Sequence, residues 1–360
     1  MSISSLNQRS DSSLSGSPLL TLFLDDGLCV LYNPKEGKIE KILRDFSGTR
    51  FLASCGNWFL MLDSRSNLYV TDVFSENRID LPPLESLVSN TSALKRVEDR
   101  DGEFTLELTD GTVFKEFAEE IRGRLWVDEK TQEFAVVWFF DAPATFLCSY
   151  KKGNRHYDFI PVGFEIPKML TGLRSFVLRG YRLYILTTRS YVRVIDFSGE
   201  KGFEELTGSE PSSPTFSPLG SYNWHSSVAV TTAGEFLLVT NTIFERSERT
   251  FCIYKKDPNA HPDDFMPDLV EVDSIGDEAL LLDLGITVPA NPALGIKPNT
   301  IYYTRHDRLC CGTSRHRPHV QRPYMVDICV FNLATKTLEP LPTPPSNMNL
   351  KDARWIFPMS

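Results

Sequence analysis

Residues 51–82 read "FLASCGNWFLMLDSRSNLYVTDVFSENRIDLP", and this stretch decides the fold. The runs "FLAS", "NWFLML" and "NLYVTDV" are short, apolar and rich in β-branched and aromatic residues, and a shorter "RIDLP" run closes the unit. Runs of this length and composition are typical of β-strands, and polar turn residues separate them. The stretch therefore predicts four antiparallel strands that follow one another along the chain.

Similar units recur outside this stretch. The runs "LCVLYN", "TFLCSY", "YVRVIDF" and "ICVFNL" are each followed by a polar turn and a shorter run. Units of this kind span 18–43, 50–82, 123–161, 173–206, 223–274 and 279–341. Four-stranded units at a spacing of roughly forty residues are typical of a β-propeller. We therefore predict an all-β propeller of about six blades, with seven as the alternative.

Two segments decide how the ring is completed. The first unit shows only three strands, so we predict that "DARWIFP" near the C-terminus supplies the fourth and closes the propeller. Residues 84–121 do not fit the repeat, and we expect an insertion there or part of a seventh blade. The insertion would hold a "FTLELTDGTVFKEF" hairpin that turns at Asp110 and Gly111. Within it, "FKEFAEEIR" (114–122) has a helical period and predicts a short helix.

The composition limits which domain organisations and which classes of protein are expected. Residues 1–17 are rich in Ser and are expected to form a disordered tail before a single propeller domain over 18–358. No run of eighteen apolar residues is present, so no membrane-spanning helix is expected. The net charge of −9 argues against nucleic acid as a partner. The chain is expected to be a monomer.

Seven cysteines occur at irregular spacings, several of them inside apolar runs. This pattern is typical of free, buried thiols in a reducing compartment. We expect the cytoplasm or the nucleus, with the mitochondrion or plastid as the alternative.

The stretch "SIGDEALLLDLG" (274–285) contains the adjacent carboxylates Asp277 and Glu278. Such a pair can perform acid–base catalysis, but no His, Lys or metal-ligand pattern accompanies it here. Local signatures of four common enzyme classes, such as G-x-S-x-G, are also absent. We interpret the pair as hydrogen-bond acceptors at the mouth of a strand, and we predict no catalytic residue and no cofactor. An enzyme with dispersed propeller residues around this pair is the alternative.

The segment "RHDRLCCGTSRHRPHVQRP" (305–323) concentrates several possible zinc ligands, but the C-x-x-C pairing of structural zinc sites is absent. We predict no metal site there. The same segment is strongly basic in an acidic chain, which suits an acidic partner or a phosphate. The candidate contact residues are the five arginines of this segment and one tryptophan from a separate long polar loop. They are Arg305, Arg308, Arg315, Arg317, Arg322 and Trp224.

The repeated units also carry a family resemblance. Stretches such as "GYRLYILTTRSYVRVIDFSG", "SIGDEALLLDLG" and "VFNLATKTLEPLP" resemble the plant F-box-associated family, called domain of unknown function 295 or the KIB-type β-propeller. The resemblance extends from about Ser17 to Trp355 and implies a propeller without known catalytic residues. Many members carry an N-terminal F-box that docks on a Skp1-type adaptor while the propeller binds a protein to be ubiquitinated.

Only about seventeen residues precede the first expected strand, whereas an F-box is a helical module of some forty to fifty residues. We therefore expect no F-box in this chain and no Skp1-type adaptor as partner. The leading hypothesis is a non-enzymatic protein-interaction module that binds a protein of unknown identity. The alternative is a substrate-recognition subunit of an SCF-type ubiquitin ligase.

Overall fold

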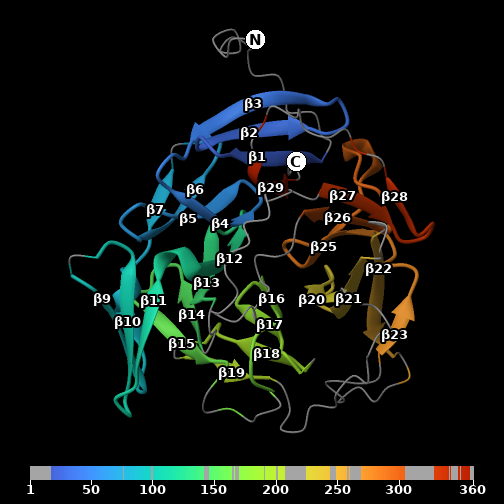
Figure 1. Cartoon of the computed structure of the whole chain (residues 1–360). Coiled ribbons are helices and arrows are strands. Elements are labelled where there is room, and N and C mark those ends of the chain that lie inside the picture. The colour runs from blue at the N-terminus through green and yellow to red at the C-terminus, as the bar shows by residue number, and fades with distance from the viewer. Residues whose placement is uncertain are drawn as a thin grey trace.

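The computed structural model describes residues 18–75, 77–98, 100–141, 146–163, 166, 170–189, 191–199, 202–206, 224–243, 249–257, 259, 269–304, 328–339, 341, 348 and 350–356. Over these residues the chain forms mainly antiparallel sheets arranged around a common centre, as Figure 1 shows. The prediction of a β-propeller is confirmed. No helix in the described part of the chain is long and apolar enough to cross a membrane.

Three blades come from the N-terminal half of the chain. Blade 1 consists of β29 (Leu350–Ile356), β1 (Leu19–Leu24), β2 (Leu28–Asn33) and β3 (Lys38–Asp45), from the centre outward. Blade 2 consists of β4 (Arg50–Cys55), β5 (Trp58–Leu62), β6 (Leu68–Asp72) and β7 (Arg78–Asp80). Blade 3 consists of β12 (Ile121–Asp128), β13 (Glu133–Phe140), β14 (Phe146–Lys151) and β15 (Tyr157–Pro161).

The remaining blades follow in chain order. Blade 4 consists of β16 (Ser175–Arg179), β17 (Arg182–Leu186), β18 (Val192–Asp196) and β19 (Glu204–Glu205). Blade 5 consists of β20 (Trp224–Val230), β21 (Phe236–Ile243), β22 (Arg249–Lys256) and β23 (Leu269–Val272). Blade 6 holds β24 (Glu278–Leu281), β25 (Ile286–Pro289), β26 (Thr300–Thr304), β27 (Ile328–Asn332) and β28 (Thr337–Glu339). A single parallel pair, Val230 with Ile286, joins blades 5 and 6 into one sheet.

The predicted closure of the ring is also confirmed. β29 pairs with β1 in antiparallel register, from Leu19 opposite Ile356 to Leu24 opposite Leu350. The last described strand of the chain is therefore the innermost strand of the first blade (Figure 1). This pairing gives the first unit its fourth strand and leaves no open strand edge between the ends of the repeat.

The hydrophobic core is divided among the spaces between neighbouring blades. One buried cluster, for example, joins Leu19 of blade 1 to Phe59 of blade 2, and another joins Phe139 of blade 3 to Phe176 of blade 4. Further clusters lie between blades 2 and 3, 4 and 5, 5 and 6, and 6 and 1. Each blade is thus buried on both faces, which explains why its strands read as continuous apolar runs rather than strict alternation.

The segment between blades 2 and 3 forms a separate three-stranded sheet, which we call the inserted sheet. It consists of β9 (Ser92–Arg96), β10 (Glu103–Leu108) and β11 (Val113–Phe117). It is preceded by η2 (Leu84–Ser86) and by β8 (Leu87–Val88), which pairs in parallel with β15 and so adds a fifth strand to the sheet of blade 3. β10 and β11 form the hairpin expected from the sequence, with Gly111 at a φ of 84° in the turn.

The short helix predicted over 114–122 is wrong. This segment completes β11, makes a single 3₁₀ turn, η3 (Ala118–Glu120), and enters β12. A strand forms here in place of the predicted helix because the backbone of β11 pairs with β10, from Glu107 opposite Val113 to Glu103 opposite Phe117. A segment of this length cannot form a stable helix without packing, whereas the hairpin supplies its hydrogen bonds at once.

The described cysteines are free, as expected, and Cys29, Cys148 and Cys329 are buried. Burial raises the pKa of the Cys55 thiol to about 11 and that of the Cys29 and Cys148 thiols further still. A thiol with a raised pKa holds little thiolate near neutral pH and reacts slowly. These cysteines therefore act as apolar packing groups.

Candidate functional site

The inserted sheet lies outside the ring of blades, beside blades 2 and 3 (Figure 1). Its inner face is apolar, because Leu94, Phe104 and Leu106 are buried in the cluster shared with both blades. The ring of Phe104 lies 5.9 Å from that of Phe140 in blade 3. Arg96 adds a polar clamp, with its Nε donating to Glu85 Oε1 at 2.6 Å and its guanidinium over the Phe104 ring. The sheet is therefore held firmly against the propeller.

The outer face of the inserted sheet carries exposed apolar side chains among charges. Val113 is 56% exposed and Phe117 is 39% exposed, and both lie on β11 with Lys115 between them. Ion pairs join Lys95 to Glu107 at 2.6 Å and Lys115 to Glu103 at 3.2 Å across this face. Exposed pairs of this kind stabilise a sheet by only about 0–1 kcal/mol each. They keep the face polar around the two apolar side chains.

β11 is also the edge strand of the inserted sheet. The sheet has the order β11-β10-β9, so within the described chain the outer side of β11 has no strand partner. An edge strand presents unpaired backbone N–H and C=O groups to which another extended chain can add. Its exposed Val113 and Phe117 point in the same direction because side chains alternate along a strand.

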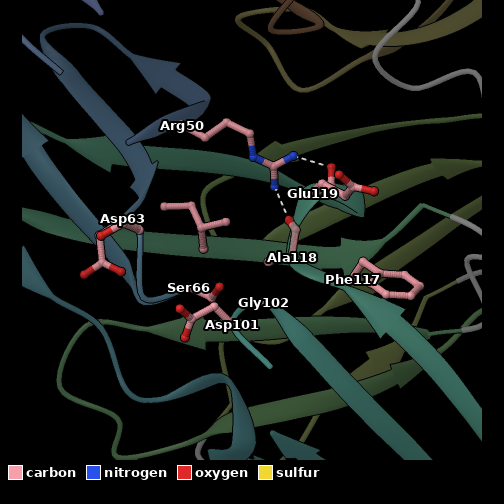
Figure 2. A pocket seen from close by; sticks show the side chains of 10 residues that line it. Arg50, Asp63, Ser66, Asp101, Gly102, Phe117, Ala118 and Glu119 are labelled. Atoms are coloured by element: carbon pink, nitrogen blue, oxygen red, sulfur yellow. Dashed lines mark hydrogen bonds between the residues drawn. The ribbon is translucent and has the colours of Figure 1, made fainter. Parts of the chain in front are cut away.

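A pocket of about 360 Å³ opens where β11 ends (Figure 2). Blade 2 contributes Arg50 of β4 and the turn between β5 and β6, which includes Asp63. The inserted sheet contributes the turn around Asp101 and the rim residue Phe117, and η3 contributes Glu119. The pocket thus lies between two sheets, and its polar wall comes from three distant parts of the sequence.

The guanidinium group of Arg50 is the cationic group of the pocket, and it is hydrogen-bonded to backbone carbonyl oxygens. Arg50 donates from Nη2 to Ala118 O and, at 2.9 Å, to Ile121 O, and from Nη1 to Glu119 O. Figure 2 shows two of these bonds, which tie blade 2 to the turn that enters blade 3. Burial and the nearby charge of Arg122 together lower the pKa of Arg50 to about 10, yet the guanidinium stays protonated at neutral pH. Arg50 therefore has a structural role in the wall of the pocket.

The carboxylates of the pocket are placed differently. Asp63 caps its own turn, because its Oδ1 accepts from the N–H groups of Arg65 and Asn67 at 2.9 and 2.8 Å. Asp101 and Glu119 are exposed at the pocket. Asp63 Oδ2 also lies 3.8 Å from Arg78 Nη2, but the exposed carboxylates of Asp101 and Glu119 give the pocket a negative character, which suits a cationic side chain.

The pair Asp277 and Glu278 does not form a convergent acidic site. Asp277 is exposed, whereas Glu278 accepts from the hydroxyl of Thr287 at 2.6 Å and from the N–H of Thr232 at 3.3 Å. Thr232 follows β20, so this carboxylate links a turn of blade 5 to the β24–β25 hairpin of blade 6. Glu278 behaves as the turn acceptor that the sequence predicts.

We expect Glu278→Gln to lower the free energy of unfolding by about 1 kcal/mol, because one charge-assisted acceptor becomes neutral. Asp277→Asn should change it by less than about 0.5 kcal/mol, because no such bonds are lost. Urea titrations of the two single variants and the double variant measure both values. Equal losses for the two single variants would contradict the assignment of the acceptor role to Glu278.

The basic candidate residues Arg305, Arg308, Arg315, Arg317 and Arg322 lie outside the described residues. The possible zinc ligands of the same segment lie outside them as well. Trp224 is the first residue of β20 and pairs with Thr242. No group of three or more His, Cys, Asp or Glu that could hold a metal occurs among the residues the structure describes.

Sequence reasoning missed the pocket and the exposed edge of β11. The hairpin was foreseen, but the side-chain pattern of β11 was assigned to a helix, which hides the alternation of Val113, Lys115 and Phe117. The carboxylates of the pocket carried no local signal, because each lies in an ordinary polar turn.

The fold and this site define a β-propeller that carries an additional sheet on its rim. Residues 31–332 match the family model described as the KIB1-4 beta-propeller, so the chain belongs to this family. The resemblance noted from the sequence is confirmed.

Relatives in Arabidopsis thaliana bear F-box names. The chain is 45% identical over 358 residues to F-box protein At5g25290, which covers 95% of this chain and 85% of the relative. It is 47% identical over 300 residues to F-box protein At2g14500, covering 81% of this chain and 84% of the relative. It is 30% identical over 354 residues to F-box protein KIB3, covering 93% of this chain and 70% of the relative.

Proposed function

We propose that the chain is a non-enzymatic protein-interaction module whose inserted sheet binds an extended segment of a partner protein. The observation that carries the proposal is the edge strand β11, with Val113 and Phe117 exposed on a sheet that is firmly packed on its other face. A rigid support lowers the entropic cost of docking, since little of the surface must be ordered on binding.

The pocket specifies the chemistry of that segment. A chain added along β11 would pass the rim at Phe117, where the carboxylates of Asp63, Asp101 and Glu119 line the opening. We therefore propose a partner segment that carries a Lys or Arg side chain next to apolar residues. The charged side chain would enter the pocket while the backbone pairs with β11.

Family membership supports an interaction role, because F-box proteins are the relatives of this chain. Substrate recognition within an SCF-type ubiquitin ligase is the second candidate function. A Skp1-type adaptor among co-purified proteins would favour that candidate, and its absence would favour a module that acts without the adaptor.

The test is affinity purification from plant tissue with quantitative mass spectrometry, using the double variant Val113→Ser and Phe117→Ser. We expect the recovery of specific partners to fall roughly tenfold, because loss of two apolar anchors costs about 1–2 kcal/mol or more. The matched control is Leu338→Ser on β28, which removes an apolar side chain that is 42% exposed on another blade. Equal recovery from the double variant and the wild type would refute the docking surface.

A second surface is compared in the same experiment. We propose that the arginines of 305–323 bind an acidic partner, and their replacement by Ser should reduce recovery more at low than at moderate salt, because salt already screens the contact of the wild type. Loss of the same partner with both sets of variants would mean one contact surface that includes both regions. Loss with the arginine variant alone would place the contact on 305–323 and refute the β11 site.

A further inference from the structure

Four buried charged side chains lie on or beside the inner strands of the ring, and we call them the axial cluster: Arg124 of β12, Asp283 after β24, and Asp352 and Arg354 of β29. The charges of Asp283 and Arg354 act on Arg124, which places it near them. Arg354 Nη1 lies 4.0 Å from Asp283 Oδ2, and Arg354 Nε lies 3.9 Å from Asp352 Oδ1. Each of the four residues is less than a tenth exposed. Charged residues are rarely buried to this extent unless they are fully paired.

Aromatic rings from two other blades complete the surroundings. The guanidinium carbon of Arg354 lies 5.3 Å from the ring centre of Phe51 in β4. That of Arg124 lies 5.4 Å from the ring centre of Phe176 in β16. Figure 1 shows the innermost strands β29, β4, β12 and β16 around the centre of the ring. Five blades therefore contribute to one buried, charged site.

The two guanidinium groups have far more donors than acceptors within reach. Among the described residues, Arg124 makes one hydrogen bond, from Nε to Phe176 O at a long 3.4 Å. Arg354 makes none, and its buried Nε has no hydrogen-bond partner. Asp283 also accepts hydrogen bonds from the N–H of Thr304 at 3.2 Å and from the Thr304 hydroxyl. Each guanidinium offers five N–H donors, so most of the ten remain unused.

The charges are as poorly matched as the hydrogen bonds. No carboxylate of the described chain lies within 4.0 Å of the Arg124 guanidinium. Burial and the positive charge of Arg354 together lower the pKa of Arg124 to about 10, although the carboxylate of Asp283 acts in the opposite direction. Two cations that repel each other in a buried site represent a cost that a bound anion would remove.

We propose that the axial cluster binds a phosphate-sized oxyanion between Arg124 and Arg354. An oxyanion supplies several acceptor oxygens to the planar guanidinium groups and neutralises the repulsion between them. Water would satisfy some donors but would leave that repulsion in place.

The carboxylates of Asp283 and Asp352 affect how tightly the ion is held. Both carboxylates lie within 4.0 Å of Arg354, and Asp283 also stabilises the charge of Arg124, so they limit how tightly an ion is held. The four side chains together carry no formal net charge, and the binding therefore depends on local geometry. We expect a modest affinity, with a Kd on the order of 1 mM.

Isothermal titration of the full chain with inorganic phosphate, against sodium chloride of equal ionic strength, tests the proposal. We expect about one phosphate per chain in the wild type and no saturable signal with chloride. Arg124→Gln should weaken phosphate binding roughly tenfold, and Arg124→Lys should weaken it less, because Lys keeps the charge but loses the forked geometry. Arg182→Gln, at an exposed arginine of blade 4, is the matched control and should bind phosphate as the wild type does.

Asp352→Asn is expected to change the affinity for phosphate in the opposite direction. Removing one negative charge beside Arg354 should tighten phosphate binding several-fold, a gain that a purely structural role of the cluster would not produce. Circular dichroism checks that each variant is folded. If Arg124→Gln does not fold, Asp352→Asn and Arg124→Lys decide the question.

Three results would overturn the proposal. They are the absence of saturable phosphate binding in the wild type, an unchanged affinity in folded Arg124 variants, and an unchanged or weaker affinity in Asp352→Asn. An unchanged affinity in the Arg124 variants would mean that phosphate binds as an adventitious ion elsewhere on the surface.

Discussion

Deletion of residues 353–360 is expected to abolish cooperative folding of the whole propeller. The deletion removes Ala353 and Trp355 from the core between blades 6 and 1, and Ile356 from the core between blades 1 and 2. It also removes most of the pairing between β29 and β1. Full truncation of a buried Trp alone costs about 3–5 kcal/mol. Together these losses exceed the net stability of a typical domain, about 5–15 kcal/mol.

Thermal unfolding followed by circular dichroism measures this effect. The graded control is Trp355→Phe, which keeps the aromatic packing against Tyr302, with ring centres 5.1 Å apart, but loses the hydrogen bond from Trp355 Nε1 to Tyr303 O. This variant should remain folded and lose about 1–3 kcal/mol, because one buried hydrogen bond and part of the ring volume are lost. An unchanged melting temperature in the deletion would show that ring closure does not stabilise the fold.

Gly285→Ala is expected to destabilise the propeller strongly, although it adds only a single methyl group. Gly285 follows β24 at a φ of 68°, a conformation that L-residues with a side chain rarely adopt. An added Cβ would lie 2.2 Å from Val177 Cγ2 in blade 4 and 2.9 Å from Val228 O in blade 5. Strain and overpacking together should cost about 3–5 kcal/mol.

Gly276→Ala is the matched control for this substitution. Gly276 has a similar φ of 71°, but nothing lies within 4 Å of an added Cβ. It should lose only about 1 kcal/mol, which isolates the cost of the backbone conformation. The double variant Gly285→Ala with Val177→Ala should recover part of the loss, and a thermodynamic cycle measures the coupling between the two sites. Similar losses for both glycine variants would show that the neighbouring blades move aside.

The blades were predictable because their signal is local and repeated. Length and composition predict strands for runs such as "LCVLYN", "NWFLML" and "YRLYILTT". The spacing of these runs predicts a propeller. The closing strand was predictable for a further reason, since a unit with only three strands must find a fourth. The alternation of side chains within "SIGDEALLLDLG" (274–285) was also predictable: Ala279 and Leu281 face blade 1, whereas Leu280 and Leu282 face blade 5.

The sites were not predictable because they form only when distant segments meet. Arg124 in "RGRLWVD" and Arg354 in "DARWI" are charges within apolar strands, and this is a signal that sequence reading could have used. Their proximity, however, depends on how blades 1 and 3 are arranged around the axis of the propeller. The pocket at Arg50 depends likewise on how a rim sheet packs on its neighbour.

The pairing of Leu19 with Ile356 has a consequence for biosynthesis. A ribosome that adds about 5–20 residues per second needs on the order of 15–70 s between these two residues. During that interval β1 has been made but its innermost neighbour has not, so Leu20 and Leu22 lack the cover that β29 provides. Such exposed strand edges favour pairing with other nascent chains. The polypeptide therefore depends on protection during translation, and its yield should respond to the speed of synthesis and to chaperone capacity.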